Sequence, residues 1–451
     1  MPQGACLSPV LAVLFLNSMG DGLKCQVSQF ADDTLLYSTA PTVEAQVQDL
    51  NDDLATIQAW CDQNRVDLKP SKCRHLCFDR RRSRQEVKAT AAVVKNQLQL
   101  PTATGPPHTI PTADRYKLLG VLFTNDLCFD THVEEGPLRN LKSQVGFVKR
   151  LTSGLGSEKR RVASVVYKGV IRPRSEYAAT VWRPGTSDAL LRQLEVKQRE
   201  IARFVIGSST RVSNVALMAE AGWRTFEDRH REHALRLLGK IAALPTTHRL
   251  RQQLEWSGRM STRFYAESIL EWSRVSCIDT RALFGTSNRT GFQQALRRHL
   301  TATADRRLAD DASRSAGLLR AVKPTTARWA HLELGNRWAA SQLTRLRLGC
   351  SRLAADQHHR GFVESPDCPR CGAGTPETRE HYLLACPAWD AQRQRLWRDL
   401  AALDLRGLHL PCDCKTLLGG HHTYSRTHLC GIAEAVGSFL ARTGRLKHIK
   451  K

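Results

Sequence analysis

Two adjacent aspartates stand between two short apolar runs near the start of this chain. The runs Cys25–Phe30 and Thr34–Ser38 partly alternate in polarity, and Ala31-Asp32-Asp33 separates them. This pattern predicts a two-stranded hairpin whose tip carries both carboxylates. Neighbouring carboxylates repel each other, which raises the pKa of one of them unless a cation lies beside them.

The acidic tip has two interpretations. A bound Mg²⁺ would relieve the repulsion, because this cation prefers carboxylate oxygens and keeps positions for water and phosphate. In nucleotidyl transfer two such ions stabilise the attacking and the leaving oxygen. Alternatively Asp32-Asp33 is an ordinary polar β-turn, and for this tetrapeptide taken alone the turn is the favoured interpretation.

A helix is predicted directly after the hairpin. Pro41-Thr42 forms its start, and Asn64 with the Lys69-Pro70 step marks its end. Its apolar residues recur every three or four positions and so share one face: Val43, Val47, Leu50, Leu54, Ile57 and Trp60.

The remaining pattern is mainly helical. Pro101–Ala113 is rich in proline and predicts a loop or linker, and Tyr116–Phe123 predicts a compact apolar strand. Residues 134–348 show helical periodicity with arginine-rich polar faces and a break at Lys323-Pro324. One predicted buried stripe in this region consists of Leu190, Leu194, Ile201 and Val205.

The charge of the chain favours a polyanionic partner. With 67 Lys and Arg against 43 Asp and Glu among 451 residues, the net charge is +24 and the pI is about 9.9. No segment is long and apolar enough to span a membrane, since the nearest candidate, Leu7–Leu16, is short and contains Pro9. Fourteen cysteines are too few for a disulfide scaffold of this length, so we expect reduced thiols and a location in the nucleus or cytoplasm rather than secretion.

Four residues near the C-terminus have the spacing of a metal site. Cys368, Cys371, His381 and Cys386 form the pattern C-x₂-C-x₉-H-x₄-C. Three thiolates and an imidazole form a closed tetrahedral set that suits structural Zn²⁺, and four protein ligands leave no open position for catalysis. The C-x-C pair at Cys412 and Cys414, with His421-His422, is interpreted as structural or incidental because that spacing chelates poorly.

Basic residues with interleaved aromatics are a further candidate for nucleic-acid contact in the helical region. The basic residues are Lys159, Arg160, Arg161, Arg172, Arg174 and Arg192, and the aromatic residues are Tyr167, Tyr177 and Trp182. For the individual aromatic side chains, burial in the core is the favoured interpretation.

Four motifs in order resemble the reverse transcriptases of non-LTR retrotransposons. They are Pro2-Gln3-Gly4 with Ser8-Pro9, then Phe30-Ala31-Asp32-Asp33, then Asn64 with Leu68-Lys69-Pro70-Ser71-Lys72, and finally Tyr116-Lys117-Leu118-Leu119-Gly120-Val121. Each motif is weak alone, but their order and spacing agree with that family. A Cys-Cys-His-Cys cluster also follows the polymerase in many of these elements. A group II intron-type maturase shares the acidic turn but does not explain the Cys/His spacing.

The resemblance implies roles for particular residues. Asp32 would bind catalytic Mg²⁺, with Asp33 as a less essential neighbour in the motif that also contains Phe30 and Ala31. Gln3 and Gly4 would contact the template and the incoming nucleotide. Lys72 would protonate or stabilise the departing pyrophosphate; its alternative is a solvated surface lysine. Leu119 and Gly120 would form a hairpin that holds the primer end, and Lys69 departs from the asparagine usual at its position.

One expected part of the polymerase site is missing from these residues. In the family, the fingers and a palm strand with another metal-binding aspartate precede the Pro-Gln-Gly segment, and no downstream residue replaces that aspartate by position. Two Mg²⁺ ions need carboxylates from two strands. We therefore predict an N-terminally truncated polypeptide with little or no polymerase activity alone.

The predicted fold class is α+β. The expected domains are a partial reverse transcriptase palm (1–130), a helical thumb-like region (131–210), a helical extension (211–350), a CCHC zinc knuckle (351–395) and a C-terminal helical segment with a basic tail (396–451). The expected function is RNA-directed DNA polymerase, with an RNA template, a DNA primer or target and deoxynucleoside triphosphates as partners. The alternative is a non-catalytic nucleic-acid-binding remnant of such an element.

Overall fold

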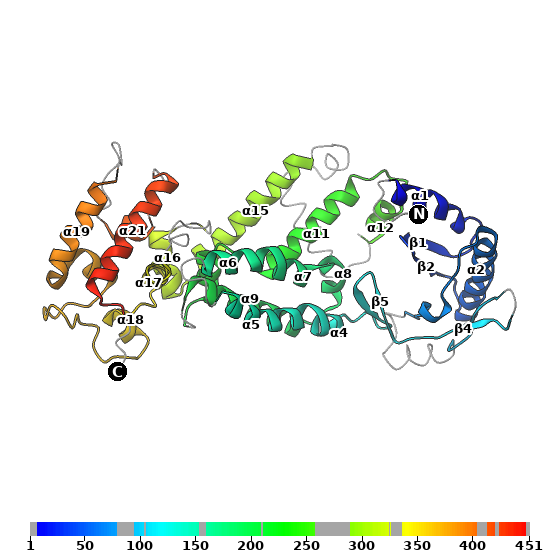
Figure 1. Cartoon of the computed structure of the whole chain (residues 1–451), viewed down its shortest axis with the longest axis horizontal. Coiled ribbons are helices and arrows are strands. Elements are labelled where there is room, and N and C mark those ends of the chain that lie inside the picture. Colours follow the sequence, from blue (N-terminus) through cyan, green and yellow to red (C-terminus); the bar gives the residue numbers. More distant parts are fainter. Residues whose placement is uncertain are drawn as a thin grey trace. The chain divides into compact units, whose positions relative to one another are not determined.

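The computed structural model describes residues 7–78, 94–102, 105–152, 159–208, 211–257, 289–323, 325, 336–403, 413–419 and 424–447 (Figure 1). The chain divides into two compact units, Met1–His132 and Val133–Lys451. The first unit combines helices with small antiparallel hairpins, and the second is built from helices. These features confirm the α+β prediction at the level of fold class.

Helix α2 (Val43–Asn64) is the main helix of the first unit, and it confirms the helix predicted after the acidic hairpin. The Thr42 hydroxyl accepts a hydrogen bond from the Ala45 N–H, so it caps one of the free donors of the first turn. Glu44 lies in the same turn, where the helix dipole favours an acid. The helix ends where Arg65 adopts a left-handed conformation with φ of +55°.

Three two-stranded antiparallel sheets accompany α2. They pair β1 (Gln26–Phe30) with β2 (Asp33–Tyr37), β3 (Leu98–Leu100) with β4 (His108–Ile110), and β5 (Arg115–Leu118) with β6 (Val121–Thr124). The first pair is the predicted acidic hairpin.

The hairpins pack on α2 through two apolar clusters. Ile57 and Cys61 of α2 form the first with Met19, and Leu36 of β2 packs against it. Leu98, Leu100 and Ile110 of the β3–β4 sheet form the second, with partly buried residues of the other half of α2 packed against it, namely Val47, Leu50 and Leu54. Because α2 contacts both hairpins, its position determines where the acidic tip lies in this unit.

Two local predictions in this unit are wrong. The proline-rich segment 101–113, predicted as a loop or linker, contains strand β4. The run Tyr116–Phe123, predicted as one strand from its pattern, is split by Leu119 and Gly120, both with positive φ, into a tight hairpin.

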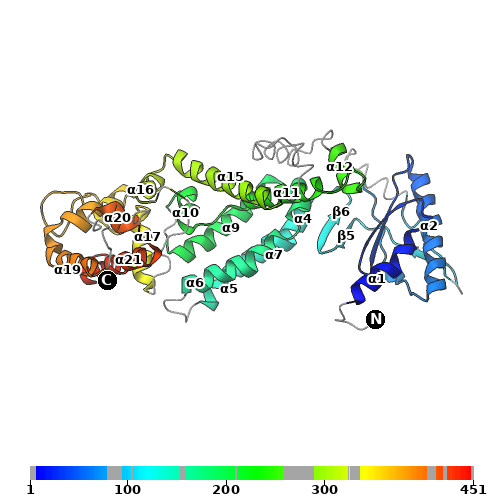
Figure 2. The same cartoon turned by 90° about the horizontal axis from the view of Figure 1, so that it is seen from above.

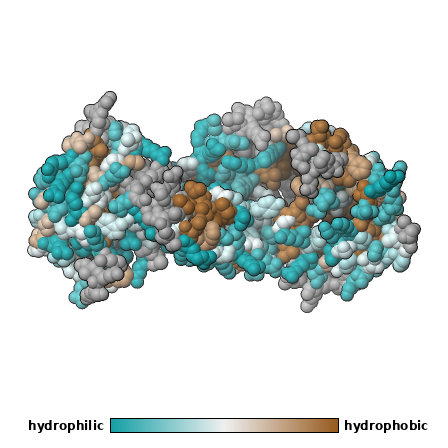
Figure 3. Space-filling model, viewed as in Figure 1, coloured by the Kyte–Doolittle hydropathy of each residue, from teal (hydrophilic) through white to brown (hydrophobic). Residues whose placement is uncertain are grey.

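Helix α1 (Ser8–Asn17) precedes the acidic hairpin and buries none of its residues. Figure 3 shows the hydrophobic surface that results over this helix, and its most exposed members are Val10, Val13 and Leu14. The helix contacts α2 through Phe15, whose ring lies 5.4 Å from that of Trp60. No helix among the described residues is long and apolar enough to cross a membrane.

The second unit confirms, in its described residues, the predicted helical pattern between residues 134 and 348, and its helices continue beyond residue 348. Its longer helices are α5 (Arg139–Leu151), α6 (Lys159–Val166), α9 (Asp188–Ile206), α10 (Asn214–Ala221), α11 (Phe226–Ala242), α12 (Arg249–Ser257), α15 (Arg289–Asp310), α16 (Arg314–Val322), α17 (Arg337–Arg347), α19 (Asp390–Ala401) and α21 (Arg426–Thr443). Its short helices include α7 (Arg172–Glu176), α8 (Ala179–Trp182), α18 (Ala354–His359) and α20 (Cys414–Gly419), while α4 (Asp130–Val133) spans the boundary between the two units. The predicted stripe of α9 is buried at all four positions.

Neighbouring helices in this unit pack side by side, as Figures 1 and 2 show for α5 with α9 and for α19 with α21. Helix α16 ends at Val322, which confirms the predicted break at Lys323. A π-helical turn over Tyr167–Ile171 joins α6 to α7.

A group of three fully buried charged residues, here called the ionic cluster, joins α10, α17 and the end of α16. Glu220 accepts hydrogen bonds from Arg347 Nε (2.8 Å) and Nη2 (3.0 Å). Lys323 Nζ lies 3.9 Å from the Glu220 carboxylate and donates to the backbone carbonyl of Ala219 (2.7 Å). Arg347 also donates to the carbonyl of Leu418 in α20. Burial lowers the pKa of Lys323 to about 8.

Candidate metal centres

The acidic tip is a two-residue hairpin loop. Phe30 pairs with Asp33, so Ala31 and Asp32 alone make the turn, and Ala31 has a φ of +55°. Asp32 and Asp33 are both exposed to solvent. A carboxylate sealed in the core could not bind a substrate metal, so this exposure satisfies a basic requirement of the predicted role.

The hairpin has one packed face and one open face. Directly opposed residues of an antiparallel pair point to the same side, so Phe30, Asp33 and Leu35 share a face. That face is open, with Phe30 65% and Leu35 41% exposed. On the other face, Leu36 packs toward α2. The acidic tip therefore borders an uncovered sheet surface with exposed apolar residues.

A buried carboxylate of α2 fixes the chain just before β1, and the sequence pattern did not indicate it. Asp53 is 2% exposed. It accepts hydrogen bonds from the backbone N–H groups of Lys24 (3.0 Å) and Cys25 (2.7 Å). The adjacent Asp52 forms an exposed ion pair with the Lys24 ammonium (2.6 Å). These contacts attach the start of the hairpin strand to the helix.

The other residues of the predicted polymerase site have mixed outcomes. Gln3 and Gly4 lie outside the described residues. Lys72 ends the short 3₁₀ turn Pro70–Lys72 and is exposed. Leu119 and Gly120 form the predicted hairpin tip, and His132 Nδ1 accepts a hydrogen bond from the Leu122 N–H next to it (3.2 Å). Burial lowers the pKa of His132, which favours the neutral ring that this bond requires.

The acidic tip has two carboxylates and no more. Among the described residues, Asp32 and Asp33 belong to no group of three or more potential metal ligands, and the Cys/His cluster is the one such group. Two Mg²⁺ ions in a polymerase need more carboxylate oxygens than these two residues offer.

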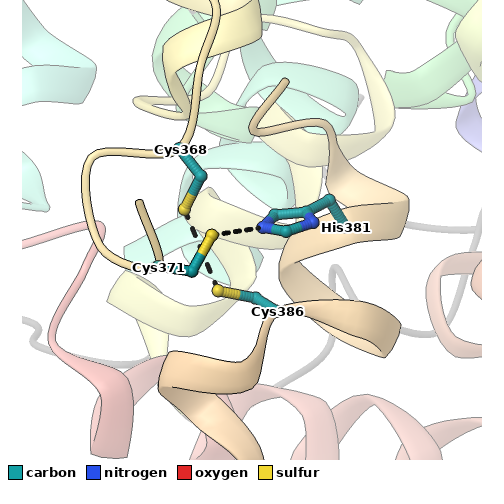
Figure 4. Close-up of side chains that lie close together, drawn as sticks. All are labelled: Cys368, Cys371, His381 and Cys386. Carbon is teal, nitrogen blue, oxygen red and sulfur yellow. Dashed lines mark hydrogen bonds between the residues drawn. The ribbon is translucent and has the colours of Figure 1, made fainter. Parts of the chain in front are cut away.

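The Cys/His cluster is brought together as predicted (Figure 4). The ligand atoms of Cys368, Cys371, His381 and Cys386 all lie within 4.8 Å of one another. Cys368 Sγ is 3.8 Å from Cys386 Sγ, and Cys371 Sγ is 3.5 Å from His381 Nε2. The two cysteines of the C-x₂-C pair come from a turn that includes Gly372, with φ of +64°.

These distances fit a tetrahedral zinc site. With Zn–S bonds of about 2.3 Å and a Zn–N bond of about 2.0–2.1 Å, two sulfurs lie about 3.8 Å apart and a sulfur and a nitrogen about 3.6 Å apart. The Cys368–Cys386 and Cys371–His381 pairs have nearly these separations. Soft thiolates with one imidazole also match the preference of Zn²⁺ over hard cations. The residues present therefore fit the predicted ion.

The cluster is largely enclosed. Cys386 is fully buried, Cys368 is 4% and His381 8% exposed, and only Cys371 is partly open. Burial raises the pKa of the Cys386 thiol, whereas a hydrogen bond from the Ala373 backbone lowers the pKa of Cys371. A cation at the centre would supply the positive charge that a buried thiolate requires.

Contacts around the cluster join it to neighbouring helices. Glu377, fully buried, accepts hydrogen bonds from Arg445 and from the Ala354 N–H at the start of α18 (2.7 Å). Tyr382 bonds to Thr443 of α21 (2.5 Å). Cys414 is buried but is not a member of the cluster, and Cys412, His421 and His422 lie outside the described residues. No disulfide bond joins two of the described cysteines.

Some of the basic and aromatic residues predicted to contact nucleic acid in the helical region are buried, and others are exposed. Arg172 is partly buried and lies 3.9 Å from Glu176, a buried carboxylate that also pairs with Arg229, so its charge is used within the fold. Tyr167 and Trp182 are fully buried, as favoured, while Tyr177 is 57% exposed. Arg174 and Arg192 are exposed, and the side chains of residues 159–161 lie outside the described part.

Comparisons with known proteins agree with the motif order. Residues 1–123 match the family model "Reverse transcriptase (RNA-dependent DNA polymerase)". A stretch of 250 residues is 23% identical to "Probable RNA-directed DNA polymerase from transposon BS" of Drosophila melanogaster, covering 53% of this chain and 26% of that protein. The chain thus spans about a quarter of this relative's length. No solved structure matches.

Proposed function

We propose that this chain, a relative of retrotransposon reverse transcriptases through its residues 1–123, works as part of an RNA-directed DNA polymerase of the non-LTR kind. The observation that carries the proposal is the exposed Phe30-Ala31-Asp32-Asp33 tip on a hairpin attached to α2. Its partners would be an RNA template, a DNA primer and deoxynucleoside triphosphates. The net charge of +24 supports binding of such polyanions.

In this proposal the first unit is part of the palm, and the helices over residues 131–210 are thumb-like. Asp32 would bind Mg²⁺ beside the α-phosphate of the incoming nucleotide, with Asp33 as its neighbour. When bound, the ions stabilise charge on the attacking and the leaving oxygen. Exposed Lys72 would contact the pyrophosphate, and the Leu119-Gly120 hairpin would contact the primer end. The missing carboxylate oxygens would come from a part of the polymerase other than the described residues.

The Cys/His cluster would hold Zn²⁺ as a structural ion and serve as the zinc knuckle. Its support is the four-ligand geometry and its enclosure, which leave no position for a substrate. The ion would keep the segment 368–386 in place against α18 and α21.

A second candidate function is non-catalytic binding of nucleic acid by a remnant of such an element. The observation that favours it is the absence of a third potential ligand beside Asp32 and Asp33 among the described residues. Both functions predict binding of nucleic acid, and they differ in whether Asp32 takes part in a metal-dependent complex.

The test uses the purified chain with a labelled RNA template annealed to a DNA primer. We expect binding that weakens steeply between about 50 and 200 mM salt. The polymerase proposal further predicts that the next complementary dNTP with Mg²⁺ stabilises the complex in the wild type and not in Asp32→Asn. Equal stabilisation in both, or none in either, would favour the remnant, and no binding of the hybrid at low salt would contradict both functions. Asp52→Asn, at an exposed aspartate outside the acidic tip and the proposed nucleotide contacts, serves as the matched control and should respond to the dNTP like the wild type.

A further inference from the structure

An exposed aromatic side chain, Phe362, follows helix α18 in a position that the backbone fixes. The Phe362 N–H donates to the Gln357 carbonyl (2.9 Å) and the Gly361 N–H to the His358 carbonyl (2.9 Å). Gly361 has a φ of +73°. This pair of bonds is the Schellman ending of a helix, so the direction of the chain at Phe362 is set by hydrogen bonds.

The usual reason for an apolar residue at this position is missing here. In a Schellman ending the residue after the glycine commonly packs on an apolar side chain in the last turn of the helix. The corresponding residue of α18 is Gln357, which is polar, and Phe362 is 58% exposed. Burial in the core therefore does not account for the ring.

Two guanidinium groups lie against the ring instead. The Cζ atoms of Arg211 and Arg360 are 4.9 and 5.3 Å from the centre of the Phe362 ring, within the range of cation–π contact. Both groups are held by backbone carbonyls. Arg360 donates to the carbonyls of Asp356 (3.1 Å) and Ser351 (2.6 Å), and Arg211 donates to that of Arg360 itself (2.6 Å).

The loop that carries the ring continues directly into the Cys/His cluster. Pro366 accepts a hydrogen bond from the Glu377 N–H (2.8 Å), and the Cys368 N–H donates to Thr375 (2.8 Å). The ring is thus presented by a loop that is bonded at both ends, with preset cations beside it. Preset groups lose little conformational entropy when a ligand binds.

We propose that Phe362, with Arg211 and Arg360, forms a binding site for an unpaired base of single-stranded RNA or DNA, an inference that rests on the proposed function in nucleic-acid binding. Bases stack on exposed aromatic rings irrespective of sequence, and arginine supplies charge for the phosphate. A protein partner fits less well, since the exposed apolar area here consists of Phe362 and Val363 alone in this loop. The exposed Glu364 of the same loop would oppose a phosphate, so the backbone of the strand would lie toward the arginines.

The test measures fluorescence anisotropy of labelled 12-nucleotide single strands, oligo(U) and oligo(dT), with the full chain. Loss of one stacking contact predicts roughly tenfold or more weaker binding for Phe362→Ala, and near wild-type binding for Phe362→Trp. Val363→Ala removes a neighbouring exposed apolar side chain without a ring, and we expect less than about twofold change. Arg211→Gln would lower the slope of log affinity against log salt concentration by about one, which corresponds to one lost phosphate contact. Comparing the two strands shows which nucleic acid the site prefers.

A photo-cross-link locates the contact independently. With 5-iodouridine in the strand, irradiation is expected to modify the tryptic peptide of residues 361–370, whose one aromatic residue is Phe362. The proposal is overturned if the wild type binds single strands but Phe362→Ala binds within twofold of it, or if Val363→Ala loses as much. A wild type that binds no nucleic acid would instead contradict the proposed function, and with it this site.

Discussion

The two candidate metal centres of this chain differ in almost every physical respect. The acidic tip offers two hard carboxylates on an exposed turn, with no further potential ligand beside them among the described residues. The Cys/His cluster offers three thiols and an imidazole that are mostly buried and whose ligand atoms all lie within 4.8 Å of one another. An open set of ligands suits an ion that must meet substrate oxygens, and a closed set suits an ion that stabilises the fold.

The difference also concerns how each site is supported. The acidic tip depends on one buried carboxylate, Asp53, that bonds to the backbone before β1. The Cys/His cluster is surrounded by ion pairs and hydrogen bonds to other parts of the sequence, such as that of Glu377 with Arg445 and that of Tyr382 with Thr443 of α21. We therefore expect perturbation of the enclosed site to unfold its surroundings, and perturbation of the open site to change binding alone.

The largest effect is expected from removing a ligand of the enclosed site. Cys386→Ser should lower the zinc content from about one ion per chain to well under one and destabilise the second unit, since structural zinc contributes ~10–16 kcal/mol in zinc-finger peptides. Atomic emission and hydrogen exchange of segment 368–400 measure both effects. The control variant Cys414→Ser changes a buried cysteine outside the cluster, and it should keep about one zinc ion per chain. Full zinc in Cys386→Ser would contradict the assignment.

The second unit also contains a buried charged site that has no metal, the ionic cluster. Glu220→Gln leaves Arg347 and Lys323 buried without their anion, and we expect a loss of about 3–5 kcal/mol in the free energy of unfolding. Urea denaturation of the second unit measures it. Glu227, an exposed residue 3.6 Å from Arg231, offers a matched control, and Glu227→Gln should change little. Equal losses of unfolding free energy in the two variants would show that the buried ionic cluster stabilises the unit no more than an exposed ion pair does.

A smaller effect is expected at the support of the open site. Asp53→Asn replaces a charged acceptor of two backbone bonds, and we expect a loss of about 1.5–3 kcal/mol with faster hydrogen exchange at Lys24, Cys25 and the hairpin amides. Asp52→Asn alters only the exposed pair with Lys24 and should leave exchange in the hairpin unchanged. If both variants exchange like the wild type, Asp53 does not hold the strand.

The most gradual effect is a pH dependence from Lys323, which is spread over several pH units. Burial lowers its pKa to about 8 from the usual 10.5, so below pH 8 both folded and unfolded chains carry the proton. Between about pH 8 and 10.5 only the unfolded chain keeps it, and stability relative to Lys323→Met should rise by at most ~1.4 kcal/mol per pH unit. Parallel urea titrations of wild type and Lys323→Met measure this difference. A difference that stays constant or falls with pH would contradict the assigned direction.

Local patterns in the sequence predicted the parts of this fold that depend on neighbours in the chain. The acidic hairpin, helix α2 and the ligands within residues 368–386 all have short-range signals, and the structure confirms them. The pattern of apolar residues did not reveal the Leu119-Gly120 turn, because neither residue interrupts the run Tyr116–Phe123. The family motif did imply a hairpin there.

Contacts between distant residues had no such signal. Glu220 meets Arg347 across 127 positions, and Asp53 meets Cys25 across 28, so neither pair has a periodic pattern that marks it. Strand β4 lies between prolines that suggested a loop, and its pairing with β3 depends on packing against α2. Phe362 resembled any other loop residue until the ending of α18 and the position of Arg211 were known.

Iron-mediated cleavage tests the central claim that Asp32 binds a divalent metal at an open site beside nucleic acid. Fe²⁺ replaces Mg²⁺ in the complex with RNA–DNA hybrid and dNTP, and ascorbate with peroxide generates radicals that cut the nearby backbone. We predict cleavage around residues 30–33 that depends on the hybrid and disappears in Asp32→Asn, while zinc content and hydrogen exchange of the second unit stay unchanged. Cleavage that is absent from this hairpin in the wild type, or equal in Asp32→Asn, would contradict the account.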